Sequence, residues 1–299
     1  MSNKNQEAVK DIASKHLGKV GGDGYSDQYN PELLVKIPRY LNREGYDLTG
    51  EEFVGYDIWN AYEVSALTNK GLPVSGMLKI VCPSNTEYHV ESKSIKLYLN
   101  SYNMTKLGDT TKQVIEELEN RVTTDLENLL GGTLNVKFHT NNFSTEEKFD
   151  VTPLSSLIDL DNIKFTSYHS DAGALKGKEG EKLYTYAFQS DLLRSNCRVT
   201  NQPDWGDVII KMSTKRKVDF ESIAKYIVSH RKVSHFHEEI CEMIYKHFTD
   251  AYEPTQLMVA CLYTRRGGID INPIRATDIS LIPDWYSLPH IRIAKTLRQ

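Results

Sequence analysis

The 299-residue chain has little cysteine and no cysteine spacing typical of a zinc site or a disulfide framework. Its four cysteines, Cys82, Cys197, Cys241 and Cys261, are widely separated, and none belongs to a CxxC pair. Short cysteine spacings are what structural zinc sites and disulfide-rich domains require. The sequence therefore argues against both, and we expect a protein of the reducing cytoplasm that holds no metal.

Basic excess, long apolar runs and a glycine-rich nucleotide motif are also missing. Lys and Arg number 36 against 40 Asp and Glu, for a net charge of -4. Surfaces that bind nucleic acid or membranes are usually basic, so neither partner is expected. The longest apolar runs, such as 257–262, are too short to span a bilayer. Residues 1–24 lack the apolar core of a signal peptide, and without GxGxxG a Rossmann-type site is unsupported.

The spacing of apolar residues divides the chain into two similar halves. The first half predicts strands and helices at 53–66, 74–81, 87–90, 92–102, 111–130, 134–139 and 149–151. The second predicts strands at 184–197, 207–212, 257–263 and 269–271 around two helices that begin at Asp219 and Phe236. Each half thus reads strand-strand-helix-helix-strand-strand. This order favours an α+β fold with antiparallel sheets and the helices on one face.

Segments without clear periodicity set the expected domain limits. Residues 152–181 are rich in Ser, Asp and Gly, and we interpret them as a linker between domains at 1–151 and 182–299. Within the first domain, residues 1–47 are expected to form an arm with a short helix at 8–16. The tail after Ala276 is expected to be irregular.

One stretch of the second domain carries the parts of a covalent catalyst. Cys197 is followed seven residues later by Asp204, with Pro203 fixing the backbone before it and 202–206 expected as a connection. A thiolate is a good nucleophile, and a carboxylate can take the thiol proton and return it to a substrate. The ordinary alternative is that Cys197 is a small buried hydrophobic residue.

Charged side chains at two predicted helix starts are candidate binding groups. Glu91 precedes a helix with Ser92 as its expected N-cap and Lys93 and Lys96 one turn apart, an arrangement that favours anions such as phosphate. An ordinary capped helix with solvated lysines has the same pattern. In the second domain a carboxylate of His237-Glu238-Glu239 could accept two donors from a planar heterocycle, or could simply compensate a helix dipole.

Two further features of the second domain remain ambiguous at this point. His235 and His237 could be metal ligands, but no third ligand is suitably spaced. The predicted hairpin at 264–268 places Arg265 and Arg266 before two glycines. Paired cations on a hairpin could bind phosphates, or could face solvent.

These stretches together give the chain a specific resemblance. The run Glu91-Ser92-Lys93-Ser94-x-Lys96-Leu97-Tyr98, Ser195-Asn196-Cys197 with Gln202-Pro203-Asp204-Trp205-Gly206, and Phe236-His237-Glu238 occur in one chain. The chain resembles the long, two-domain form of the NADPH-dependent 7-cyano-7-deazaguanine reductases, nitrile reductases of the queuosine pathway. The resemblance also includes 37–43, 57–59 and 263–273. It implies two tandem tunnelling-fold domains and a homodimer.

The resemblance also implies roles for individual residues. Cys197 would form a covalent thioimide with the nitrile of a small deazapurine substrate, and Asp204 would be the general acid and base, with His237 beside them. Glu91 and Glu238 would hold the nucleobase, within a substrate-binding set of Val90, Glu91, Ser92, Phe236, His237 and Glu238. The cofactor, two NADPH per turnover, would contact Ser92, Lys93, Lys96, Arg266 and Gly267.

Two other functions remain open. The first is a zinc-dependent cyclohydrolase on the same fold, with Cys197 and His237 as metal ligands. The second is a non-catalytic purine- or pterin-binding module in which Cys197 has a structural role.

Overall fold

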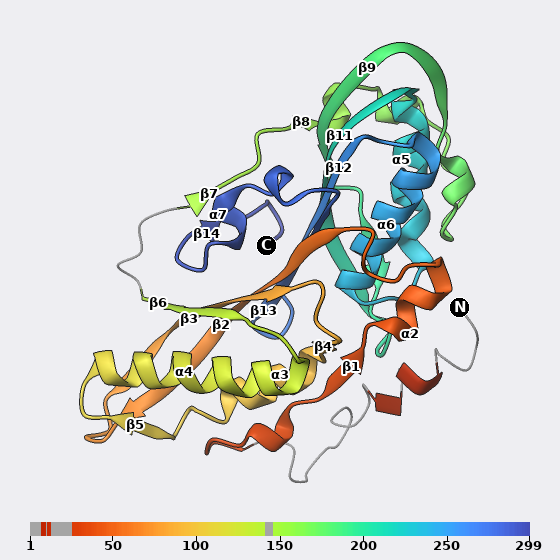
Figure 1. Cartoon of the computed structure of the whole chain (residues 1–299). Coiled ribbons are helices and arrows are strands. Elements are labelled where there is room, and N and C mark those ends of the chain that lie inside the picture. The colour runs from red at the N-terminus through yellow and green to blue at the C-terminus, as the bar shows by residue number, and fades with distance from the viewer. Residues whose placement is uncertain (1–6, 10, 13–25, 141–145) are drawn as a thin grey trace.

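The computed structural model describes residues 7–9, 11–12, 26–140 and 146–299, and shows an α+β protein (Figure 1). Its strands are β1 Lys36–Pro38, β2 Val54–Thr68, β3 Pro73–Pro83, β4 Tyr88–Val90, β5 Lys106–Gly108, β6 Asn135–His139, β7 Glu146–Glu147, β8 Thr152–Pro153, β9 Gly177–Ser190, β10 Arg194–Asn196, β11 Pro203–Val218, β12 Gln256–Tyr263, β13 Ile269–Ala276 and β14 Arg292–Ile293. Its α-helices are α2 Tyr40–Arg43, α3 Ser92–Asn100, α4 Thr111–Leu130, α5 Phe220–Ser229, α6 His237–Tyr252 and α7 Asp284–Ser287.

A single, mainly antiparallel sheet runs through both halves of the chain. Its strand order is β6-β3-β2-β13-β12-β11-β9-β8, with β5 and β10 as side branches of β2 and β11. The halves join where β2 pairs with β13, in a register that places Trp59 opposite Ile271. Because this seam is a continuous ladder of hydrogen bonds, the halves share one backbone scaffold (Figure 1).

The two faces of the sheet are covered by different parts of the chain. Successive side chains of a strand point to opposite faces, so Trp59 packs in the core under α3 and α4, whereas Ile58 packs on the other side. In the second half Val259 faces α5 and α6, whereas Met258 faces the C-terminal segment. The helices therefore lie on one face of the sheet, and the segment after β13 covers part of the other.

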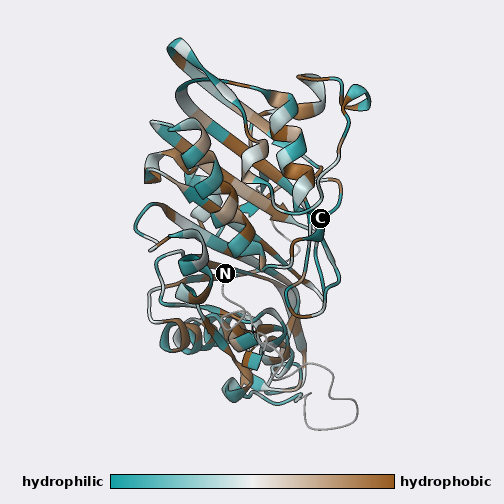
Figure 2. Ribbon diagram, turned by 90° about the vertical axis from the view of Figure 1, so that its right-hand side faces the viewer, coloured by the Kyte–Doolittle hydropathy of each residue, from teal (hydrophilic) through white to brown (hydrophobic). Residues whose placement is uncertain are grey.

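The sequence predictions for the long helices are confirmed. In α4, Thr110 and Gln113 form a capping box, and Gly131 ends the helix in the left-handed region at φ 74°. Its buried side chains recur every four residues at 114, 118, 122, 126 and 130. Stripes of hydrophobic and hydrophilic residues are visible along the helices in Figure 2. Each helix thus buries one apolar stripe against the sheet.

Several local predictions are wrong. Residues 149–151 form no strand; Phe149 instead packs on Trp285 of α7, with ring centroids 5.0 Å apart. A short apolar run suits such packing as well as a strand, so periodicity alone could not separate them. The predicted strand at 184–197 is two strands, β9 and β10, and the predicted linker 152–181 contains β8 and the start of β9. Residues 203–206, expected as a connection, belong to β11.

The N-cap of α3 and the C-terminal tail, which we expected to be irregular, also differ from the prediction. The cap is Glu91 rather than Ser92, because its longer carboxylate reaches the N–H groups of Lys93 and Ser94 at 2.9 and 2.7 Å. The tail contains α7 and β14. The short helix expected at 8–16 lies partly outside the described residues; 7–9 and 11–12 are helical. The tandem tunnelling-fold arrangement and the domain limits stay predictions.

A buried lysine anchors the C-terminal segment to the sheet. Lys79 of β3 donates to the carbonyl oxygens of Tyr286, Leu288 and Ile291 at 3.0, 2.8 and 2.7 Å. Burial, and to a smaller extent Lys295, lowers the pKa of Lys79 to about 7. The Lys79 amine therefore supplies donors to three carbonyl groups in and after the last turn of α7. Lys79 thus holds the turn after α7 in place.

We expect Lys79→Met to lower the free energy of unfolding by about 3 kcal/mol, because three backbone carbonyls lose their shared buried donor. Urea denaturation at pH 7 measures this. The matched control is Lys137→Met, since Lys137 forms a half-exposed pair with Glu119 and should lose less than about 1 kcal/mol. Equal losses in the two variants would contradict the anchoring role.

Candidate active site

A β-hairpin places the thiol and the carboxylate on one face. β10 pairs antiparallel with β11 so that Ser195 lies opposite Asp204, and the N–H of Cys197 donates to the carbonyl oxygen of Gln202 at 2.8 Å. Cys197 and Asp204 are therefore diagonal neighbours, a relation that separates Cα atoms by about 7–8 Å in antiparallel sheets. The seven-residue spacing follows from this hairpin, whose loop bends through Asn201 at φ 55°.

Cys197 differs from the other three cysteines in its exposure. Cys82, Cys241 and Cys261 are buried, whereas Cys197 is partly exposed. Burial raises the pKa of Cys82 to about 11, and burial and then Cys241 raise that of Cys261 well above its usual value. Buried thiols of raised pKa are poor nucleophiles, so Cys82 and Cys261 suit packing roles, and Cys197 is the accessible thiol of the set.

The start of α6 lies directly against this hairpin. Asn196 forms a parallel bridge with Ser234, supported by bonds from the N–H of Asn196 to Val233 and from the N–H of His235 to Asn196, at 2.7 and 3.1 Å. Glu239 accepts from the N–H of Phe236 at 3.0 Å and so caps the helix. These contacts bring the first turn of α6 beside Cys197.

One pocket gathers most of the predicted site residues from both halves of the chain. The space between its walls, open to solvent, is about 690 Å³. Of the predicted residues, those lining it are Val90, Glu91, Ser92, Lys93, Lys96, Cys197, Asp204, Phe236, His237, Glu238 and Arg266. Gly267 is not in the lining, but a Cβ there would lie 3.0 Å from the Nζ of Lys96. The lining also contains Trp59, His89, Val199, Thr200, His235, Ile269 and Ile271.

Asp204 is buried between two cationic or potentially cationic groups. The Nη1 of Arg266 forms an ion pair with one carboxylate oxygen, and the Nε2 of His237 lies 3.5 Å from the other. Burial raises the pKa of Asp204, but His237 and Arg266 together outweigh it, so the pKa lies below its usual value. His237 is held in place by stacking on Tyr263, with ring centroids 3.8 Å apart. Asp204 is therefore a carboxylate near neutral pH.

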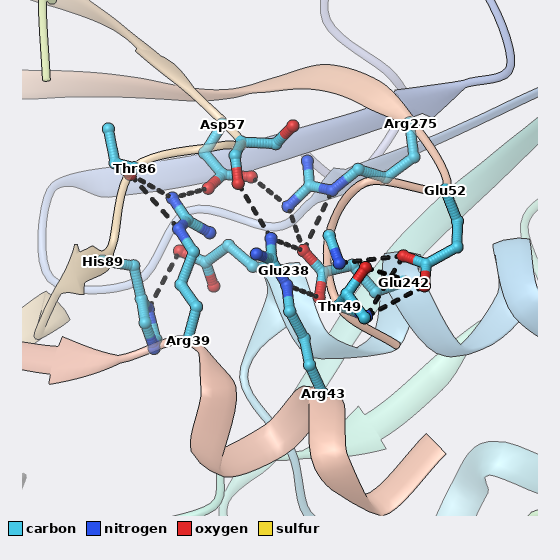
Figure 3. Close-up of polar contacts among 12 residues, drawn as sticks. Arg39, Arg43, Thr49, Glu52, Asp57, Thr86, His89, Glu238, Glu242 and Arg275 are labelled. Carbon is cyan, nitrogen blue, oxygen red and sulfur yellow. Dashed lines mark hydrogen bonds and ion pairs between the residues drawn. The ribbon is translucent and has the colours of Figure 1, made fainter. Parts of the chain in front are cut away.

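Glu238 is a buried carboxylate with an unused acceptor. It is 3% exposed, and its Oε1 has no hydrogen-bond partner among the residues that the structure describes. The Nδ1 of His89 lies 3.7 Å away, beyond hydrogen-bond distance (Figure 3). A buried carboxylate oxygen without a donor is costly. Glu238 is thus prepared to accept donors from a ligand in the pocket.

Glu91 is less free than the sequence indicated. Its Oε2 accepts from the N–H groups of Lys93 and Ser94, and its Oε1 accepts from the hydroxyl of Ser92 at 3.2 Å. An internal carboxylate therefore already occupies this helix N-terminus, as in the ordinary capped helix that was the alternative to a phosphate site. The positive charge of Lys93 and Lys96 remains available. Burial, followed by Arg266, lowers the pKa of Lys93.

Behind the pocket lies a buried charge network whose members the sequence did not mark as site residues (Figure 3). Asp57 of β2 pairs with Arg39 and Arg275 at 2.7 and 2.8 Å. Glu242, one turn after Glu238 on α6, pairs with Arg43 and Arg275 at 2.8 and 2.9 Å. The network joins α2, β2, β13 and α6, and thereby sets where the first turn of α6 lies over the sheet.

Sequence reasoning also missed the ion pair that follows the thiol. Arg198 pairs with Glu239, and both side chains are buried. The Nδ1 of His235 lies 3.0 Å from the Oε2 of Glu239. In the sequence Arg198 follows Cys197 and Glu239 follows Glu238, but this adjacency does not show that Arg198 and Glu239 form an ion pair.

The comparisons with known proteins identify the family. A family model described as "Nitrile reductase, 7-cyano-7-deazaguanine-reductase N-term" matches residues 25–138, and one described as "QueF-like protein" matches 203–280. The NADPH-dependent 7-cyano-7-deazaguanine reductase of Psychrobacter cryohalolentis is 36% identical over 276 residues, 87% of this chain and 93% of its own. The chain belongs to the 7-cyano-7-deazaguanine reductase family.

A second relative and one solved structure also align with this chain. The reductase of the same name from Coxiella burnetii strain CbuK_Q154 is 37% identical over 260 residues, 85% of this chain and 89% of its own. A solved apo-form archaeosine synthase QueF-Like is 18% identical and aligns over 34% of this chain and 95% of its own, with a TM-score of 0.28. That score is too low to inform the fold.

Within the described ranges, no group of three His, Cys, Asp or Glu side chains is placed to hold a metal ion. None of the described helices combines the length and apolar character needed to cross a membrane.

We expect Glu242→Leu to lower the free energy of unfolding by about 3–5 kcal/mol, because it leaves Arg43 and Arg275 buried without their shared carboxylate. Denaturant titration measures the loss. Glu179→Gln is the control, since Glu179 forms an exposed 3.7 Å pair with Arg216 and should cost less than about 1 kcal/mol. A loss of that small size in Glu242→Leu would show that the network does not hold α6.

Proposed function

We propose that this protein reduces the nitrile of 7-cyano-7-deazaguanine to the aminomethyl group with NADPH, as a step of queuosine biosynthesis. The names of its relatives support the reduction, and the pocket supports its chemistry. The observation that carries the proposal is the meeting of an accessible thiol, an ionised Asp204 and the unpaired carboxylate of Glu238 in one pocket. Homodimer formation and a cytoplasmic location stay predictions.

Nucleobase recognition would rest mainly on Glu238. A deazaguanine presents N–H donors along one edge, and a carboxylate can accept two of them in a charge-assisted contact. Phe236 and the flat stack of His237 on Tyr263 flank this part of the pocket. A ligand without those donors would leave Glu238 unpaired and would be rejected. Glu91 would contribute through Oε1 once Ser92 rotates away from it.

Covalent activation of the nitrile would use Cys197 and Asp204 as one unit. The sulfur adds to the nitrile carbon and forms the S–C bond of a thioimide. The thiol proton passes to Asp204, which is ionised near neutral pH and so able to accept it. Asp204 then donates this proton to the substrate nitrogen, which gains negative charge as the triple bond opens. His237 contacts Asp204 throughout.

The cations at the rim fit the phosphates of NADPH. Lys93, Lys96 and Arg266 line one side of the pocket, and Gly267, whose missing side chain leaves room beside Lys96, lies next to them. Guanidinium and ammonium groups are suited to phosphate. When bound, NADPH would supply hydride. Two are needed for each product, because converting a nitrile to an amine takes four electrons and two further protons.

The direct test is NADPH oxidation that depends on 7-cyano-7-deazaguanine, with the amine identified by mass and a ratio of two NADPH per amine. We expect Cys197→Ala to bind the nucleobase without any covalent adduct, and wild-type protein to gain the mass of the nitrile. Wild-type protein that binds the nitrile but never forms an adduct or oxidises NADPH would instead be a binding module.

We expect Asp204→Asn to retain nucleobase binding and to reduce the nitrile about 10²–10⁴-fold more slowly, since that is the usual contribution of a general acid and base. Single-turnover kinetics with saturating NADPH measures the effect. Turnover at the wild-type rate would refute the proton-transfer role of Asp204.

We expect Glu238→Leu to weaken nucleobase affinity by about 3 kcal/mol or more, because two charge-assisted hydrogen bonds are lost. Calorimetric titration in a Cys197→Ala background isolates binding from reaction. The matched control is Glu63→Leu: Glu63 has an exposed side chain and contacts Lys96, so nucleobase affinity should stay within about threefold. Unchanged affinity in Glu238→Leu would remove Glu238 from the substrate site.

A further inference from the structure

Arg266 is attached to the thiol hairpin as well as to the rim of the pocket. It lies in the loop between β12 and β13, where its N–H donates to the carbonyl oxygen of Ile269 at 2.9 Å and its own carbonyl oxygen accepts from the N–H of Ile269 at 3.2 Å. Its Nη1 pairs with Asp204, and its Nη2 donates to the Oε1 of Gln202 at 2.7 Å. Gln202 is the residue whose carbonyl binds the N–H of Cys197. The guanidinium therefore bridges the hairpin that carries both reacting groups.

The same guanidinium lines the pocket together with the thiol of Cys197. Burial lowers the pKa of Arg266, but Asp204 and, to a smaller extent, Cys197 raise that pKa by more, so the net shift is upward. Arginine has five donors in a rigid fork and can serve two acceptors at once. Arg266 is thus bound to the Asp204 carboxylate and to Gln202 of the hairpin, in the pocket that holds the nucleophile, an arrangement that a residue serving the cofactor alone would not need.

We propose that Arg266 is a positioning residue for the Cys197–Asp204 pair: it holds the Asp204 carboxylate ionised and aimed at the thiol, so that the proton of Cys197 can be accepted before any hydride arrives. This role rests on the proposed function and is additional to the cofactor contact that the resemblance implies. In the step concerned, the S–H bond breaks, the proton moves to a carboxylate oxygen of Asp204, and the sulfur electron pair forms the bond to the nitrile carbon.

The other cations of the pocket have different partners. Lys96 lies 3.7 Å from the exposed carboxylate of Glu63, and Lys93 follows the Glu91 cap. The groups that face Asp204 are His237 from α6, Arg266 from the β12–β13 loop, Tyr263 from β12 and Cys197 from the hairpin. Of these, Arg266 is the permanent cation, since arginine stays protonated in proteins.

The loss of Arg266 has a definite consequence for pH dependence. Asp204 accepts a proton only while it is ionised, so thiol addition should fail as pH falls through the pKa of Asp204. Arg266 and His237 hold that pKa below its usual value, which keeps the acid limit of the wild-type protein low. Removing the guanidinium should therefore move the acid limit toward higher pH, because burial, which raises the pKa, is then opposed by His237 alone.

The test uses two reactions that need no NADPH. One is formation of the covalent adduct with 7-cyano-7-deazaguanine, and the other is alkylation of Cys197 by iodoacetamide. The rate of each is measured by mass spectrometry over a range of pH. We expect Arg266→Gln to slow both at least tenfold at pH 7 and to move the acid limit upward, and Arg266→Lys to recover part of the rate. Arg265→Gln is the matched control, since Arg265 neighbours Arg266 but lies over the ring of Tyr62, 4.4 Å from its centroid; both cofactor-free rates should stay within about twofold.

The outcomes separate the two roles. If Arg266→Gln keeps both cofactor-free rates and their pH limits and only weakens NADPH binding, Arg266 serves the cofactor alone and the proposal is wrong. If wild-type protein forms no adduct, the proposed function fails, and alkylation alone decides whether Arg266 positions the pair. The Arg266 side chain is 24% exposed, so the Arg266→Gln variant should keep its fold. If it unfolds, the folded Arg266→Lys variant decides the question. Slow alkylation of its Cys197 supports the proposal, and alkylation at the wild-type rate overturns it.

Discussion

The architecture depends on a buried set of charges in which two carboxylates, Asp57 and Glu242, share three arginines (Figure 3). Arg275 lies in both groups, and burial is outweighed by the two acids, which raise its pKa. Removing one member would leave another charge in the interior without compensation, a large penalty, whereas the complete set is tolerated. The network therefore fixes how α2 and α6 pack on the seam between β2 and β13, because every charge is paired in only one arrangement.

The pocket is built on that register from pieces that each come from a different place in the chain. The seam of the sheet supplies the floor, with Trp59 opposite Ile271. The β10–β11 hairpin supplies Cys197 and Asp204, and the first turn of α6, one turn before Glu242, supplies His237 and Glu238. Because rigid elements hold these side chains, the Cys197 thiol, the Asp204 carboxylate and the Glu238 carboxylate are oriented before a ligand binds.

Comparison with the sequence predictions shows which kinds of inference are reliable. Helix α4 was predictable because its caps and its apolar spacing are properties of neighbouring residues. The strand expected at 149–151 and the Ser92 cap were wrong because each local pattern allowed two structures. Phe149 packs under α7, and Glu91 reaches the helix N-terminus in place of Ser92. The continuous sheet was not predictable from the halves, since strand order depends on pairing between distant segments.

By itself the sequence determined the α+β class, the long helices, the family and eleven of the residues that line the pocket, because these follow from local periodicity and from motifs a few residues long. Only the tertiary structure decided how the charges are paired. Arg43 and Glu242 are separated by 199 residues, and Arg266 and Asp204 by 62, so no local pattern links them. A charge takes the partner that folding brings within a few ångströms in a desolvated interior, and that distance is set by the packing of the sheet and helices as a whole.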